Sequence, residues 1–155
     1  MPPTRSAGLL LYRLTADGPE VLLGHMGGPL WARRDDRAWS IPKGEYPPDE
    51  EPLAAARREF AEELGSPPPD GEARPLGEVR QSGGKVVVAW ALAGDLDVGT
   101  VRSNTFEMEW PRGSGRTRSF PEIDRAAWFG LDAARPKLVS AQVAFLDRLA
   151  EALAG

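Results

Sequence analysis

The pattern of apolar and polar positions predicts β-strands through most of the chain. An apolar run over residues 7–12 stands between polar flanks, as in a buried strand, and a turn at 17–19 leads to a partner strand over 20–24. A Ser-Gly-Gly sequence at 82–84 is typical of a hairpin turn. The other predicted strands are 39–41, 73–81, 85–93, 105–110 and 126–129.

Two helices are predicted between and after these strands. The first follows a Pro-Pro-Asp sequence at 47–49 and stops at Gly65, just before a run of prolines. The second covers 136–154, where apolar residues recur at helical spacing. Polar loops are expected at 25–38 and 111–119. Because strands outnumber helices and the two alternate, we expect one α/β domain over residues 1–155, a sandwich with a mixed sheet.

Composition and charge exclude several classes of protein. The 155 residues include no cysteine, which rules out disulfides, thiolate zinc sites and a cysteine nucleophile. A formal net charge of -4 argues against a partner that is an extended nucleic acid. The first apolar run is too short to cross a membrane and lacks the features of a signal peptide. We therefore expect a cytoplasmic protein with no membrane partner.

Three glutamates of the first helix carry the strongest chemical signal. Glu59, Glu62 and Glu63 stand at i, i+3 and i+4, which places their carboxylates on one helical face. Like charges so close repel unless a cation lies among them, and carboxylate oxygens suit Mg²⁺, with Mn²⁺ as a substitute. The alternative is an ordinary solvated face, which is what most charge runs are.

Flanking residues fit a structural supporting role for this cluster. Gly44 lets the main chain approach a metal or phosphate because it has no Cβ. Gly65 suits the residue that ends a helix. Arg58 precedes the first cluster glutamate, and Glu50 near the helix start is its expected partner. We interpret this pair as a brace for the loop and not as part of the chemistry.

This spacing resembles the Nudix box. The box consists of Gly, five residues, Glu, seven residues, Arg-Glu, an apolar residue, any residue, Glu-Glu, any residue, Gly and a final aliphatic residue. Only the final position departs, with Ser66, which affects packing after the helix and not the carboxylates. The matching residues are Gly44, Glu50, Arg58, Glu59, Phe60, Glu62, Glu63 and Gly65.

The resemblance implies an α/β/α Nudix sandwich that hydrolyses a diphosphate linkage in a nucleotide. It implies metal ligation by Glu59, Glu62, Glu63 and the Gly44 carbonyl. Expected catalytic residues are Glu59, Glu62 and Glu122, and members of the family differ in which glutamate is the general base. Here Glu59 and Glu122 are the alternatives, because Glu122 precedes a Trp-containing strand, as such a late-loop glutamate does.

The segment 39–45 resembles Nudix proteins that act on diadenosine polyphosphates and predicted nucleoside triphosphate pyrophosphohydrolases. A nucleoside triphosphate or dinucleoside polyphosphate is therefore the expected substrate. Lys43, Arg33 and Tyr46 are the expected substrate contacts, although a solvated loop also accounts for Arg33. Trp31 and Trp110 are candidates for stacking on a base, although core or loop packing is the commoner role of a single aromatic residue.

Two rival functions remain open from the sequence. One is removal of pyrophosphate from the 5′ end of RNA, which the acidic balance disfavours. The other is a non-catalytic Nudix module that senses a nucleotide, which the complete set of box glutamates disfavours. Nudix domains often pair, so a homodimer is also an open alternative.

Overall fold

A computed structural model describes residues 4–155, and the first three residues of the predicted 1–155 domain lie outside the described residues. The main sheet has the strand order β3-β2-β1-β6-β5, with β4 paired to β1 and β9 paired to β2. Its strands are β1 (Arg5–Thr15), β2 (Gly18–Met26), β3 (Trp39–Ser40), β4 (Lys43–Glu45), β5 (Arg74–Arg80), β6 (Val86–Ala93) and β9 (Ile123–Gly130).

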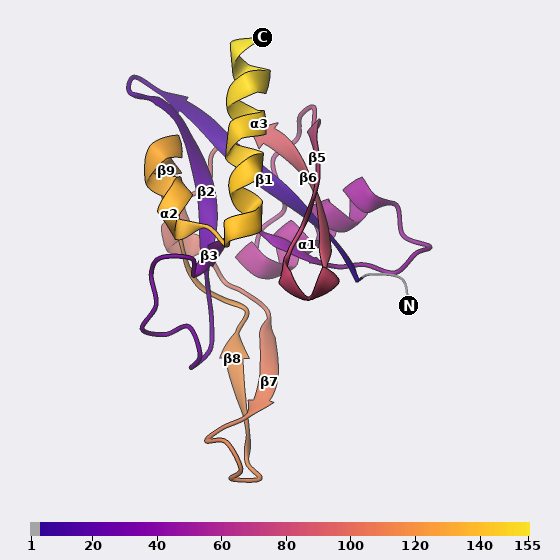
Figure 1. Cartoon of the computed structure of the whole chain (residues 1–155), viewed down its shortest axis with the longest axis vertical. Helices are drawn as coiled ribbons and strands as arrows, with labels where there is room; N and C mark the ends of the chain where they lie inside the picture. The colour runs from indigo at the N-terminus through magenta and orange to yellow at the C-terminus, as the bar shows by residue number, and fades with distance from the viewer. Residues whose placement is uncertain (1–3) are drawn as a thin grey trace.

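A separate ribbon and three α-helices complete the structure. Strands β7 (Thr105–Glu109) and β8 (Thr117–Pro121) pair only with each other and project from the body as a hairpin (Figure 1). The α-helices are α1 (Pro52–Leu64), α2 (Leu131–Lys137) and α3 (Val143–Ala154). Short 3₁₀ turns are η1 (Ser82–Gly84), η2 (Val98–Thr100) and η3 (Ser140–Gln142).

Strand β1 is the centre of the sandwich because both of its faces are buried. Ala7, Leu9 and Leu11 join the apolar cluster that packs under α1. Leu10 and Tyr12 join the opposite cluster, which contains the apolar side of α3. A strand covered on both faces is apolar at consecutive positions, which explains the continuous run in the sequence. The expected α/β sandwich with a mixed sheet is confirmed, since β1 is parallel to β6 and antiparallel to β2.

Helix α1 begins and ends as its sequence indicates. Glu51 caps the N-terminus by accepting a hydrogen bond from the Ala54 N–H at 2.6 Å, and Pro52 occupies the first helical position. The buried side of the helix contains Ala55, Ala56, Phe60 and Leu64. Burial of this side against β1 leaves most of the acidic side free to face a cavity.

The predicted C-terminal helix over 136–154 is wrong in its first part. Helix α2 ends at Lys137, and Leu138 is extended with φ −71° and ψ 147°. Leu138 forms a parallel bridge with Trp39, and the Val139 N–H donates to the Trp39 carbonyl at 2.9 Å. This pairing draws the backbone out of the helical conformation, so α3 starts only at Val143. No helix within residues 4–155 has both the length and the apolarity that a membrane crossing needs.

Three other elements were not expected from the pattern. Residues 117–119 of the predicted loop 111–119 belong to β8, which the polar sequence Thr-Arg-Ser does not suggest. Helix α2 contains Pro136 and few apolar residues. Strand β4 is only three residues long, and it forms because residues 43–45 pair with Ser6, Ala7 and Gly8 of β1.

Gln142 ties the C-terminal segment to the strand that leads into β4. Its side chain is fully buried, and its Oε1 accepts a hydrogen bond from the Ile41 N–H at 2.9 Å. Its Nε2 donates to Ser40 Oγ at 3.0 Å and to Gln81 Oε1 at 2.9 Å. Buried polar groups of this kind are costly when they lose their partners.

We predict that Gln142→Met, which keeps the volume but removes the amide, lowers the free energy of unfolding by about 1–3 kcal/mol. Urea denaturation measures the change. Gln81→Met is the matched control, because it removes only one of these hydrogen bonds at a less buried position, and it should cost less than Gln142→Met. Equal stability of Gln142→Met and wild type would contradict a role for this network.

Candidate active site

A polar cavity of about 470 Å³ opens beside the acidic face of α1. Strand β4, helix α1 and the segment just before β9 supply side chains to its wall. Six of the residues predicted as site residues line it together, namely Lys43, Gly44, Glu59, Glu62, Glu63 and Glu122. Ser6, Glu45, Lys85 and Asn104 complete the lining.

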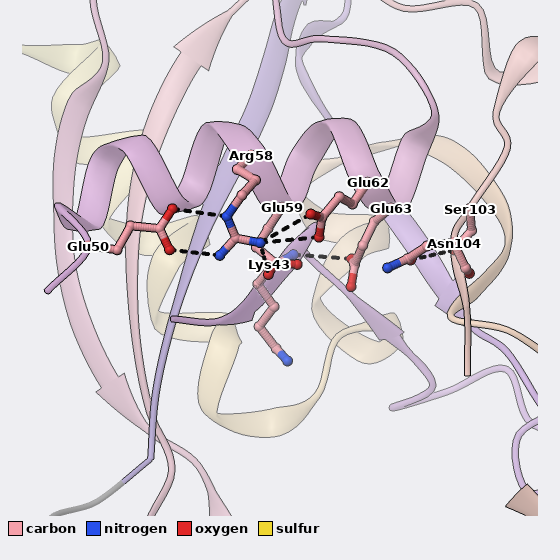
Figure 2. Close-up of polar contacts among 8 residues, drawn as sticks. All are labelled: Lys43, Glu50, Arg58, Glu59, Glu62, Glu63, Ser103 and Asn104. Atoms are coloured by element: carbon pink, nitrogen blue, oxygen red, sulfur yellow. Dashed lines mark hydrogen bonds and ion pairs between the residues drawn. The ribbon is translucent and has the colours of Figure 1, made fainter. Parts of the chain in front are cut away.

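Arg58 holds the carboxylates of α1 in order. Its Nε and one terminal nitrogen donate to the two oxygens of Glu50 at 2.9 and 2.8 Å, a bidentate geometry. Its other terminal nitrogen donates to Glu59 at 2.8 Å and to both oxygens of Glu62 at 3.2 Å (Figure 2). Hydrogen bonding to Glu50 first, and to Glu59 and Glu62 next, raises the pKa of Arg58. The same Arg58 contact lowers the pKa of Glu50.

Gly44 lies in direct contact with Glu59. A Cβ built on Gly44 would stand only 1.9 Å from Glu59 Oε2, so no other residue fits without moving the carboxylate. The residue Glu59 is 8% exposed, and burial raises the pKa of its carboxyl while Arg58 opposes that rise. The main chain of β4 at Gly44 and the buried carboxylate of Glu59 are therefore close enough to bind the same metal ion.

Glu63 and Lys43 form the inner end of the cavity. The backbone N–H of Lys43 donates to Glu63 Oε1 at 3.2 Å. Burial raises the pKa of Glu63 to about 8, and the nearby Lys43 ammonium only partly offsets that rise. Burial also lowers the pKa of Lys43. A carboxylate this strongly perturbed by burial favours a cation as its partner.

The chemistry of these donors fits a hard divalent cation, although they are not gathered around one point. Among residues 4–155, no three acidic or histidine side chains converge closely enough to enclose an ion. The reason is visible in the contacts, because Arg58 holds Glu59 and Glu62 while Glu63 turns to the Lys43 N–H. The close contact of Glu59 with Gly44 and the buried Glu63 are the observations that fit a metal.

The end of α1 brings a further segment to the cavity. Gly65 adopts φ 80° and its N–H donates to the Ala61 carbonyl at 2.8 Å, which closes the helix. Beyond it, the Asn104 N–H donates to the Glu62 carbonyl, and the Glu122 N–H donates to the Asn104 carbonyl, both at 2.9 Å. These backbone bonds fix Asn104 beside the end of α1 and Glu122 beside Asn104.

Lys85 and Asn104 were missed by sequence analysis. Lys85 directly precedes β6. The chain has three lysines, and two of them, Lys43 and Lys85, line the cavity. The scarcity of lysine was therefore a signal that could have pointed to Lys85 as a site residue. Asn104 carried no signal, because it follows a loop whose path depends on contacts with α1.

Two predicted substrate contacts lie outside this cavity. Arg33 is exposed in the loop between β2 and β3 and is not part of the lining. Tyr46 is half-buried and packs against the cluster under α1. Its N–H donates to the Arg5 carbonyl at 3.2 Å, which turns it toward β1.

Comparison with known families accounts for this combination of residues. The NUDIX domain model matches residues 2–149, nearly the whole chain. The chain belongs to the Nudix family. With that membership, the protein is a hydrolase of the general pyrophosphohydrolase class. No curated protein matches this Nudix chain in sequence.

Solved structures share the fold at low sequence identity. An Ap4A hydrolase from C. elegans in a binary complex is 23% identical, with a TM-score of 0.65 and coverage of 98% of both chains. The NUDIX domain of Shewanella oneidensis NrtR, complexed with ADP ribose, is 16% identical, with a TM-score of 0.67 and coverage of 99% of this chain and 90% of that one. A MutT protein from Methanosarcina mazei Go1 is 22% identical, with a TM-score of 0.65 and coverage of 99% and 97%.

The burial of Glu63 predicts a specific dependence of stability on pH. Its pKa is about 8 in the folded protein and near 4.5 when exposed, so the folded state binds the extra proton between these values. The free energy of unfolding should therefore fall as the pH rises from 4.5 to 8, by about 1–3 kcal/mol from this group. Urea denaturation in the presence of a chelator at several pH values measures the fall.

Glu63→Gln should abolish that part of the fall, because its amide does not ionise. Glu107→Gln is the control, since Glu107 is exposed on β7 and should leave the pH dependence as in wild type. Parallel pH profiles for wild type and Glu63→Gln would contradict the assignment.

Proposed function

We propose that this Nudix protein hydrolyses a phosphoanhydride bond in a nucleoside triphosphate or a dinucleoside polyphosphate and depends on Mg²⁺. The observation that carries the proposal is one polar cavity lined by Glu59, Glu62 and Glu63 on one side and by Lys43 and Lys85. Carboxylates are suited to the cation and ammonium groups to a phosphate chain. A cavity that offers both suits the magnesium complex of a polyphosphate.

The substrate class is also supported by the similar structures. The C. elegans protein is an Ap4A hydrolase, and the Shewanella domain is complexed with ADP ribose. Ap4A and ADP ribose both contain adenosine joined to a further group through phosphates. At identities of 23% and 16% these neighbours support the class of ligand and do not select one member of it.

Glu59, Glu62, Glu63 and the Gly44 carbonyl are the residues that would hold Mg²⁺. When bound, Mg²⁺ neutralises phosphate charge, lowers the pKa of water and favours attack at phosphorus. Lys43 and Lys85 bind phosphate oxygens as point charges. Arg58 keeps Glu59 and Glu62 from moving apart, because one nitrogen contacts both carboxylates.

Glu122 is the proposed general base. It lines the cavity, and its backbone is held by hydrogen bonds to Asn104 and Gly27. Its carboxylate is outside the Arg58 network, so it is free to accept a proton from the attacking water. Glu59 is the alternative base, but its bond to Arg58 and its contact with Gly44 favour a ligand role.

We predict that Glu62→Gln lowers Mg²⁺-dependent turnover at least about 100-fold while the fold is kept, because the amide retains the shape but loses the charge. The assay measures phosphate or pyrophosphate release from nucleoside triphosphates, dinucleoside polyphosphates, ADP-ribose and 5′-triphosphate RNA, with products identified. Glu107→Gln should be fully active. The proposal fails if wild type releases no product from any of these substrates, or if Glu62→Gln retains full activity.

Glu122→Gln tests the general base separately. We expect kcat to fall about 10²–10⁴-fold with KM nearly unchanged, since proton transfer is lost while the phosphate contacts remain. Steady-state kinetics on the best substrate measure both constants. An unchanged kcat would remove Glu122 from the mechanism and leave Glu59 as the base.

A further inference from the structure

A second cavity lies next to the polar one and has the opposite character. It has a volume of about 180 Å³. One wall is the loop after β2, residues 27–31, which includes Trp31, and the other wall is formed by Phe106 and Met108 of β7. We call it the apolar pocket. The proposed phosphoanhydride chemistry does not use it.

Strand β7 runs from the polar cavity into the apolar pocket. Asn104, which lines the polar cavity, is two residues before Phe106 and four before Met108. Alternate residues of an extended chain share a face, so these three side chains point to the same side. At about 3.3 Å per residue, Phe106 lies about 7 Å further along than Asn104. That spacing is close to the size of a sugar ring.

The two cavities also share a wall. The Gly27 N–H donates to the Glu122 carbonyl at 2.9 Å. Gly27 lines the apolar pocket and Glu122 lines the polar cavity. The space for a phosphate chain and the space beside Trp31 therefore adjoin at this backbone contact, which brings both within the span of one extended ligand.

The loop that carries Trp31 is held in place before any ligand binds. The Trp31 N–H donates to the Gly28 carbonyl at 3.2 Å, and the Arg34 N–H donates to the Trp31 carbonyl at 2.9 Å. His25 is fully buried, and its Nε2–H donates to the Arg34 carbonyl at 2.6 Å. A pocket wall fixed by its own backbone bonds binds a ligand without first having to be ordered.

We infer that the apolar pocket binds the base of the nucleotide whose phosphates occupy the polar cavity. This inference rests on the proposed function. Trp31 and Phe106 both line the pocket with aromatic surface, which suits a flat ring system, and Leu30 of the same lining is 47% exposed. The pocket has room for one base and is too small for a folded partner. The walls are mostly apolar, so shape and stacking set the preference.

The test compares a nucleoside triphosphate with ribose 5-triphosphate, which has the same phosphates and sugar but no base. Wild type should prefer the nucleotide by at least about tenfold in kcat/KM, which is within the range of stacking on one aromatic side chain. Phe106→Ala and Trp31→Ala should each reduce the ratio of the two kcat/KM values about 5- to 10-fold. Met108→Trp, which fills the pocket without removing a wall, should reduce it in the same way.

Phe120→Ala is the matched control. Phe120 is the cross-strand neighbour of Phe106 in the same ribbon but does not line the pocket. The Phe120→Ala variant should keep the wild-type ratio of the two kcat/KM values. The inference is overturned if wild type treats the two substrates alike, or if Phe120→Ala lowers the ratio as much as Phe106→Ala does.

A binding measurement separates this inference from the proposed function. Calorimetry with a nonhydrolysable nucleoside triphosphate and Mg²⁺ should give a Kd that Phe106→Ala and Met108→Trp weaken about 5- to 10-fold. Binding of this kind without any hydrolysis by wild type would contradict the proposed function and support the pocket. Hydrolysis with no effect of these variants on the Kd or on the ratio would leave the function standing and overturn the pocket.

Discussion

Negative charge concentrated on one face of α1 is the constraint on which the site depends. Glu59, Glu62 and Glu63 repel one another, and Glu59 and Glu63 are also removed from water. The guanidinium of Arg58 offsets part of this repulsion through its contacts to Glu50, Glu59 and Glu62. Arg58 does not contact Glu63, whose neighbour of opposite charge is Lys43, a side chain that burial also penalises in its charged form. The protein thus maintains a charge imbalance that the proposed divalent cation would relieve.

The packing of the sandwich holds the acidic side chains in place despite this charge imbalance. Helix α1 is fixed by apolar packing under β1, and β4 is fixed by pairing with the same strand, so the two sides of the Gly44–Glu59 contact share one support. A shift of α1 or β4 away from this contact would disturb β1, which is covered by apolar side chains on both faces. Packing of the core therefore adds to the Arg58 contacts in keeping the carboxylates together.

Local patterns were enough for the parts of the fold whose causes are local. The continuous apolar run of β1, the Pro and Gly ends of α1 and the spacing of its glutamates all act within a few residues, and each appears where it was expected. Strand β4 and the break at Leu138 depend on pairing with distant strands, which no local pattern contains. The same is true of Asn104, which reaches the cavity only because its backbone bonds to the end of α1. Tyr46 likewise packs on the cluster under α1, a contact that its loop sequence does not indicate.

Within residues 4–155, the β7–β8 ribbon is joined to the main sheet by its ends and by no strand pairing (Figure 1). Substitutions along it can therefore alter Phe106 or Met108 without disturbing β1 or α1. If the proposed base pocket and the proposed chemistry hold, ligand preference and hydrolysis belong to parts of the chain with different structural support. Descendants of this protein could acquire new substrates by remodelling a peripheral hairpin while the carboxylate helix stays as it is.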